Sequence, residues 1–342
     1  MLKVEGPDNL FNYYLNDPTT PTLVIRVPLP KLTDIPLKIE VIGFREGPLV
    51  QEDSIRIQAA STLFSIAFTM KRVNSIRKME KWAVTDILRV NPRAGKQFNA
   101  YYDRYGLHFF YEQHPHTKKI VFTCDSTEAV NHEFGHAILD SFRPDLWDLN
   151  EFEIFSFHEA FGDIISMLSS LNHQMVIEYA LKETDGDLSK SNVISRVAEE
   201  FGAALCVRDL HLNRPNNCLR DASQLFQYVT PESLPPGGSL SVLGKEAHNF
   251  SRVFSSAWYK IFVELYNKYN KGNPIESIIY ARDVMARLTI LCLPNVEKKS
   301  KIFCSVAEAI IKTDKEIHGG THIDIIRKIF LIRNILPPQT LY

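Results

Sequence analysis

The stretch of sequence that most constrains the fold is 131–140, which reads Asn-His-Glu-Phe-Gly-His-Ala-Ile-Leu-Asp. An α-helix places residues four apart on one face, so His132 and His136 can direct two imidazole nitrogens at one metal ion. Glu133 is rotated by roughly 100° from His132, which places its carboxylate beside such an ion rather than on it. We therefore expect a helix here, with a metal site on its inner face.

The flanking residues also favour a helix. Residues 125–128 read Asp-Ser-Thr-Glu and supply an N-cap with an acid three residues on, and apolar residues between 129 and 138 supply faces for packing. The alternative is an ordinary helix with two surface histidines. For a chain with 11 histidines in 342 residues, about 0.02 copies of H-E-x-x-H are expected by chance, although motif matches do include false positives.

A second segment, 155–163, strengthens the metal interpretation. It reads Phe-Ser-Phe-His-Glu-Ala-Phe-Gly-Asp within another apolar, helix-like stretch. The chain between the two motifs is long enough for one helix to end, turn near 143–145, and a second helix to return. Glu159 then completes a His-His-Glu donor set with an open fourth position, as catalytic zinc requires. Asp163, one turn beyond Glu159, can accept the remaining ring N–H of a ligand histidine.

The two motifs together, HEFGHAILD followed by HEAFGD, resemble those of the thermolysin-like zinc metallopeptidases of the gluzincin group. The resemblance implies one catalytic zinc bound by His132, His136 and Glu159, and endopeptidase activity in which Glu133 is the general base toward a zinc-activated water. A metzincin would need glycine and histidine where this chain has Leu139 and Phe142, so that group is excluded.

Further residues match the same resemblance. Asn99 and Ala100, in an Asn-Ala-aromatic-aromatic stretch, correspond to an edge strand that binds an extended peptide substrate. Arg220 corresponds to an arginine that binds a substrate carbonyl. His248 stands at the family's interval from Arg220, is followed three residues on by Ser251, and corresponds to a histidine that stabilises the transition state. Without the resemblance, His248 would be an ordinary histidine near a helix N-terminus.

Three features depart from the family pattern. Residues 137–158 contain no tyrosine, although the family uses a linker tyrosine to stabilise the oxyanion. Leu243 stands where an aspartate would orient the catalytic histidine, and the nearby Glu246 is not at the matching position. Ser170 replaces a calcium-binding acid, and the acidic turn 183–187 lacks the spaced ligands of a calcium loop, so we expect no calcium.

Two alternatives remain open. A gluzincin aminopeptidase would need acids near the edge strand to bind a free amine, and Asp103 is the acid there. A weakly active, zinc-containing peptide-binding protein would account for the missing tyrosine and aspartate. The intact Glu133 favours an active peptidase, because a binding module needs no general base.

The pattern over the whole chain predicts an α+β protein with the two-lobed thermolysin-like architecture. We expect a mixed α/β N-terminal lobe, 1–145, that contains the edge strand and the HExxH helix, and a mainly helical C-terminal lobe, 146–342. Residues 1–20 are expected to be irregular. Strands are predicted at 22–27, 37–42, 98–102, 106–111 and 120–123, and further helices at 54–88, 155–168, 247–269, 274–291, 301–311 and 321–335.

Charge and composition limit the kinds of molecule that the chain is expected to bind. A formal net charge of −1 gives no electrostatic reason to expect nucleic acid. The chain has no N-terminal signal pattern, no pro-segment, and no run of roughly 18 apolar residues, so we expect no membrane contact. Five cysteines without C-x-x-C spacing favour reduced thiols and a cytoplasmic location. The expected partner is a peptide or protein substrate, and the oligomeric state is left open.

Overall fold

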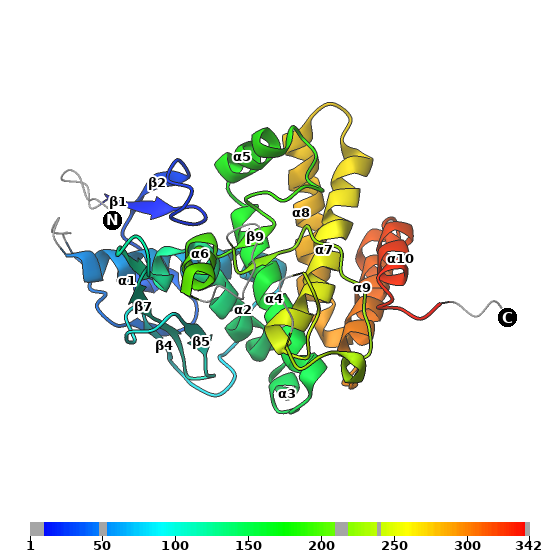
Figure 1. Cartoon of the computed structure of the whole chain (residues 1–342), viewed down its shortest axis with the longest axis horizontal. Helices are drawn as coiled ribbons and strands as arrows, with labels where there is room; N and C mark the ends of the chain where they lie inside the picture. Colours follow the sequence, from blue (N-terminus) through cyan, green and yellow to red (C-terminus); the bar gives the residue numbers. More distant parts are fainter. Residues whose placement is uncertain (1–9, 48–52, 209–217, 238–240, 339–342) are drawn as a thin grey trace.

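The computed structural model describes residues 10–47, 53–208, 218–237 and 241–338, with no side-chain description for 206–208. Within these residues the protein is a mixed α+β structure in which helices predominate (Figure 1). The strands are β1 Leu10–Tyr14, β2 Val24–Pro28, β3 Ile39–Val41, β4 Leu88–Asn91, β5 Ala100–Tyr102, β6 Gly106–Phe109, β7 Tyr111–Gln113, β8 Ile120–Phe122, β9 Arg196–Val197 and β10 Arg220–Asp221. The α-helices are α1 Ser54–Ile76, α2 Thr127–Phe142, α3 Pro144–Trp147, α4 Phe152–Ser170, α5 Gln174–Thr184, α6 Glu199–Arg208, α7 Ala247–Tyr269, α8 Pro274–Leu291, α9 Ile302–His318 and α10 Ile323–Ile332.

The largest sheet has the strand order β3-β4-β6-β5. The β3–β4 and β4–β6 pairs are parallel, whereas β5 is antiparallel to β6 and lies at the edge. In β4 the side chains of Leu88 and Val90 are buried and Arg89 between them is exposed, which is the alternation of a half-buried strand. The edge strand β5 contacts α2, the helix that carries the HExxH motif.

Helix α2 begins where the sequence predicts. Ser126 is its N-cap, and the hydroxyl oxygen accepts the backbone N–H of Ala129 at 3.4 Å. Every residue from Thr127 to Asp140 is buried, because α1, α4 and the sheet surround the helix. Such a helix can carry histidines and carboxylates only if each finds a partner.

Helices α2 and α4 approach each other unusually closely, and two glycines allow this. A Cβ atom added to Gly135 of α2 would lie 2.8 Å from the Cα of Gly162 on α4. A Cβ atom added to Gly162 would lie 2.7 Å from Nδ1 of His132. Both distances are shorter than any that real Cβ contacts tolerate, so a side chain at either position would push the helices apart.

A buried polar cluster connects α1 to the same helix pair. The Asn131 amide donates to the hydroxyls of Ser65 and Ser169, both at 3.0 Å, and to the Thr127 carbonyl at 2.9 Å. Its carbonyl oxygen accepts from Thr69 at 2.6 Å. Asn131 directly precedes His132, so this cluster fixes the position of the first residues of the HExxH motif.

The C-terminal helices form the right-hand part of the molecule in Figure 1. Helix α7 lies between α4 and the outer helices α8 and α10, and α9 contacts α4, α8 and α10. Aliphatic and aromatic side chains of these helices share one core, which includes a stacked pair of Phe250 and Phe303 with centroids 5.4 Å apart. This packing gives α7 a fixed position relative to α4, and the N-terminus of α7 carries His248.

One helix prediction is wrong in its last third. The sequence predicts a helix over 54–88, but α1 ends at Ile76 and Arg77 is extended. The Asn74 side-chain oxygen accepts the backbone N–H of Met79 at 2.8 Å, which competes with a further helical turn. Trp82 is then buried, with its indole N–H on the Lys38 carbonyl at 2.8 Å, and the chain enters β4.

The N-terminal prediction is also wrong in part. Residues 1–20 are expected to be irregular, but Leu10–Tyr14 forms β1 and pairs with β2 over five residue pairs. Phe11 and Tyr13 face the core from this strand. The preceding residues 1–9 lie outside the described part of the chain. The sequence analysis also missed the helices α5 and α6.

The structure also bears on the predicted fold class, the lobes, the cysteines and membrane-spanning helices. The α+β class is confirmed. The division into lobes at 145/146 stays a prediction, and one core of buried side chains extends on both sides of that point. Cys124 and Cys292 are buried free thiols. No helix in the described residues combines the length and the apolar character needed to cross a membrane.

We predict that Asn131→Ala lowers the free energy of unfolding by ~2 kcal/mol or more, because it leaves buried hydroxyls of α1 and α4 without their partner. Urea unfolding followed by circular dichroism measures the change. The matched control is Asn172→Ala, since Asn172 is half-buried and donates a single bond, to Leu168. Equal losses in both variants would show that the Asn131 cluster contributes no special stability.

Candidate metal centre

Three side chains from α2 and α4 converge on one point. Nε2 of His132 lies 3.2 Å from Oε2 of Glu159, and Nε2 of His136 lies 3.6 Å from Oε1 of the same carboxylate. Each residue offers a donor atom within 4.8 Å of the other two. Two ligands of a tetrahedral zinc, each ~2.0 to 2.1 Å from the ion, are about 3.3 Å apart. The spacing of the three donors therefore fits a single zinc-sized ion.

The electrostatics of these groups also fit a metal. Burial lowers the pKa of His136 to about 3, so its imidazole is neutral and can donate a lone pair. Burial alone would raise the pKa of Glu159, but His248 and His136 outweigh it and hold that pKa well below its ordinary value. Burial opposes charge on His132 too, yet hydrogen bonds to Asp163 and Glu159 raise its pKa to about 10. A bound metal would replace that proton between His132 and Glu159.

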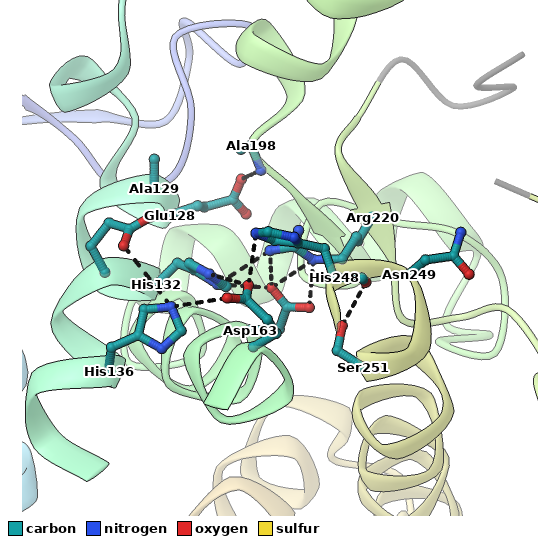
Figure 2. A network of polar contacts seen from close by, with 12 residues as sticks. Glu128, Ala129, His132, His136, Asp163, Ala198, Arg220, His248, Asn249 and Ser251 are labelled. Atoms are coloured by element: carbon teal, nitrogen blue, oxygen red, sulfur yellow. Dashed lines mark hydrogen bonds and ion pairs between the residues drawn. The ribbon is translucent and has the colours of Figure 1, made fainter. Parts of the chain in front are cut away.

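Asp163 orients the first histidine, as the sequence predicts. Nδ1 of His132 donates to Oδ1 of Asp163 at 2.9 Å, which directs Nε2 toward Glu159. Asp163 is 1% exposed, and Arg220 binds it through three contacts of 2.7 to 3.0 Å from Nε and Nη2. Burial raises the pKa of Asp163, but the charge of Arg220 and the bond from His132 outweigh it, so the pKa lies below its ordinary value. Figure 2 shows this chain of contacts.

Arg220 thus has a role that the sequence analysis did not assign. It lies on the two-residue strand β10, which pairs with β9, and lines the same pocket as His132 and Glu133. Its Nη2 is 3.3 Å from Nδ1 of His132. The structure therefore shows Arg220 supporting Asp163, and contact with a substrate carbonyl stays a prediction.

Glu133 lies beside the donor set without belonging to it. Its Oε2 is 4.0 Å from Nε2 of His136, and the residue is 7% exposed. Burial raises the pKa of Glu133 to about 7, with Glu159 adding to the effect and His132 opposing it. A carboxylate with a pKa near neutrality can both accept and release a proton, which suits a general base.

His248 reaches the site from the first turn of α7. Its Nε2 is 3.4 Å from Oε2 of Glu159, and its Nδ1 donates to Oε1 of Glu246 at 2.5 Å. The pKa of His248 is raised, first by attraction to Glu159 and further by Glu246, against the effect of burial. The ring therefore favours its charged form and can donate a hydrogen bond into the pocket.

Glu246 is the orienting carboxylate that the sequence left open. It is the N-cap of α7, and its side chain also accepts the backbone N–H groups of His248 and Asn249. It takes the place that Leu243 cannot fill. Ser251, by contrast, donates its hydroxyl to the His248 carbonyl at 2.8 Å, so it secures the helix turn (Figure 2).

A pocket of about 360 Å³ opens beside the donor set. Asn99 and Ala100 line it from the start of the edge strand, and Ala129, Leu219 and His248 line it as well. The sequence analysis missed the rest of its apolar wall, which consists of Val197, Ala198, Phe201 and Leu205. No local signal marks this wall, because β9 and α6 reach the pocket only through the fold.

Glu128 fixes that wall to the motif helix. Its carboxylate, 1% exposed, accepts the backbone N–H of Ala198 at 2.9 Å (Figure 2). Glu128 stands one turn before His132 on α2, so the pocket wall and this member of the donor set are positioned by the same helix. The acid that the sequence suggests as part of a helix N-terminus has this second role.

The tyrosine that stabilises the oxyanion in the family has no counterpart among the described residues that line the pocket. Within the described part of the chain, Nδ1 of His136 and both ring nitrogens of His158 are buried without a hydrogen-bond partner. The rings of His136 and His158 are 6.0 Å apart, and Trp147 packs edge-on against His158 at 5.1 Å. Packing rather than a hydrogen bond therefore orients the second ligand histidine.

Comparisons with known proteins assign neither a family nor a function to this chain. No family model matches the chain, and no curated protein matches it. What can be said of its function therefore rests on the residues and their arrangement.

We predict that Asp163→Asn weakens zinc binding by ~10 to 100-fold, because the amide is a poorer acceptor for His132 and leaves Arg220 without its counter-charge. Competition with a chromogenic chelator measures the affinity. The control is Asp140→Asn, since Asp140 is also buried and paired with an arginine, Arg104, but its partners among the described residues include none of the three residues of the donor set. An unchanged affinity for Asp163→Asn would remove Asp163 from the metal site.

Proposed function

We propose that this protein is a zinc-dependent endopeptidase with the two-lobed architecture of the thermolysin-like enzymes. The observation that carries the proposal is the placement of Glu133, a buried carboxylate with a pKa near 7, next to a His-His-Glu donor set in a pocket that also borders an edge strand. A purely structural zinc site has four protein ligands and no neighbouring base. The donor set of two imidazoles and one carboxylate suits zinc best among common divalent ions.

Glu133 acts on the water that attacks the peptide bond. Zinc, when bound, supplies the Lewis acid that polarises the scissile carbonyl and lowers the pKa of water. Glu133 takes the proton from that water and passes it to the leaving nitrogen. Its raised pKa favours both steps at neutral pH, since neither protonation state is strongly preferred.

His248 stabilises the charge that develops on the substrate carbonyl oxygen. Its Nδ1 is held by Glu246, which leaves Nε2 directed toward Glu159 and the pocket. The raised pKa favours the protonated ring, and a positioned donor gains most when the oxygen becomes negative. This arrangement compensates in part for the missing linker tyrosine.

The substrate is an extended peptide that adds to β5. An edge strand offers unpaired backbone N–H and carbonyl groups, and β5 is bonded on one side only, to β6. Asn99 and Ala100 lie at the start of this strand and line the pocket. The apolar wall around Phe201 and Leu219 favours an apolar residue after the cleaved bond.

The aminopeptidase alternative gains no support from the acid nearest the edge strand. Asp103 accepts the backbone N–H groups of Tyr105 and Gly106 at 3.0 and 2.8 Å and lies 3.3 Å from Nε2 of His108. Its carboxylate therefore closes the turn between β5 and β6 and does not line the pocket. An enzyme that binds a free amino terminus would need such an acid inside the pocket.

We predict that Glu133→Gln retains zinc and the fold but loses nearly all turnover, because the amide cannot accept the proton from water. Cleavage of a peptide library by the zinc-loaded parent, with mass-spectrometric mapping, first supplies a substrate. Glu133→Asp serves as the matched control, since it keeps a carboxylate in a withdrawn position and should retain a small part of the rate. If Glu133→Gln cleaves as fast as the parent, the proposed mechanism fails. Tight binding without cleavage by the parent would favour the peptide-binding alternative.

We predict that His248→Ala lowers kcat by ~100-fold or more with little change in peptide affinity, because the ring acts on developing charge. Glu246→Gln should give a smaller loss, since it weakens the orientation of the ring but leaves the donor. Steady-state kinetics and direct binding of the same peptide separate the two effects. A rise in the dissociation constant at unchanged kcat in His248→Ala would make it a binding residue instead.

A further inference from the structure

A second cluster of metal-binding side chains lies on the C-terminal helices. Asp314 and His318 are one turn apart at the end of α9, and His322 is the N-cap residue of α10. Each offers one donor atom within 4.8 Å of the other two. In Figure 1 these helices form the right-hand end of the molecule, on the side of α7 and α8 away from the sheet. None of the three residues lines the pocket beside Glu133.

The two histidines of this cluster have nearly the same mutual geometry as those of the first. The rings of His318 and His322 are 5.1 Å apart at 83°, and those of His132 and His136 are 4.9 Å apart at 87°. In the first pair the regular helix sets this geometry. In the second pair a Gly-Gly turn does so, since Gly319 and Gly320 have φ of 60° and 82° and return the chain over the end of α9.

Hydrogen bonds within the protein explain the positions of two of the three residues, Asp314 and His322. Asp314 accepts Nδ1–H of His322 at 2.7 Å through Oδ1 and the backbone N–H of His322 at 3.0 Å through Oδ2. The Tyr280 hydroxyl donates to Nε2 of His322 at 3.1 Å. Asp314 and His322 are 0% and 1% exposed, so this pair holds the turn against α9.

These hydrogen bonds do not involve the ring of His318. Its Nε2 is buried and has no hydrogen-bond partner among the described residues. A buried nitrogen without a partner costs free energy that folding has to offset elsewhere. The turn is already closed by backbone bonds, from Gly320 to the Asp314 carbonyl and from Thr321 to the His318 carbonyl. A ligand that accepts the lone pair of His318 would give this nitrogen its partner.

We propose that Asp314, His318 and His322 bind a second zinc ion that fastens α10 to the end of α9. On binding, the ring proton of His322 moves through solvent from Nδ1 to Nε2, so the imidazole stays neutral and Nε2–H donates to the Tyr280 hydroxyl oxygen. The ion takes the place of the Nδ1 proton between that nitrogen and Oδ1 of Asp314. The pair opens from 2.7 Å to about 3.3 Å, the distance between two ligands of a tetrahedral zinc. Oδ2 keeps its bond to the backbone N–H, His318 supplies the third ligand, and water supplies the fourth.

The charges around the cluster make this site the weaker of the two. Asp314 is its one carboxylate ligand, and the positive charge of Arg287 acts on His318. The first site has Glu159 as ligand and Asp163 behind His132. A chelator is therefore expected to remove the second zinc first. Since α10 packs against α7, that loss lowers the melting temperature of the chain.

The test counts zinc and measures melting temperature in four proteins equilibrated with buffered zinc: the parent, His318→Ala, Glu159→Gln and the control His116→Ala. His318→Ala removes a ligand but leaves the Asp314–His322 pair that holds the turn. His116 is an exposed histidine in the turn between β7 and β8. We expect two zinc ions in the parent and in His116→Ala, and one in His318→Ala. The zinc-dependent rise in melting temperature should be smaller in His318→Ala.

Glu159→Gln separates this proposal from the proposed function. If Glu159→Gln retains one zinc and the added His318→Ala removes it, the second site stands whether or not the chain cleaves peptides. If the parent binds a single zinc that His318→Ala leaves in place, the proposal is overturned and the cluster serves only to hold the turn. The same holds if the melting temperatures of His318→Ala and His116→Ala respond equally to zinc.

Discussion

The close contact between α2 and α4 is the constraint on which the site depends. It exists because Gly135 and Gly162 face each other with no room for a Cβ atom on either. At this separation the Glu159 carboxylate from α4 reaches His132 and His136 on α2 at 3.2 and 3.6 Å. A wider spacing would leave two histidines and a carboxylate buried and unpaired, which is costly. Helix packing and ligand geometry are thus set by the same two residues.

The charged side chains around that contact form two series of ion pairs. His132 is held by Asp163, and Asp163 is held by Arg220 from β10. On the other side His248 approaches Glu159 and is held by Glu246. Each of these charges therefore has a partner of opposite sign, and apart from His248 and Glu246 at the start of α7 the paired residues come from different elements. Glu133 is the exception, since its nearest opposite charges are weaker than its burial, and its raised pKa suits it for proton transfer.

A helix boundary predicted from sequence is accurate where neighbouring residues determine it, and inaccurate where residues distant in sequence do. The helix 247–269 agrees with α7 at both ends, because the Glu246 cap and the apolar periodicity lie within the segment itself. The helix predicted over 54–88 is wrong after Ile76, because a side chain, Asn74, competes for a backbone N–H and a distant strand recruits Leu88. Apolar periodicity alone could not distinguish a buried strand from a further turn of helix.

The sequence by itself determined the ligand spacing of His132 and His136, because a single helix fixes residues four apart. It also indicated Glu159, since an acid on an apolar helix needs a partner. Only the tertiary structure decided that Glu246 orients His248 and that residues of the segment 197–205 line the pocket. Those contacts join elements whose relative position depends on the path of loops and on helix packing. No local pattern in the sequence encodes that path.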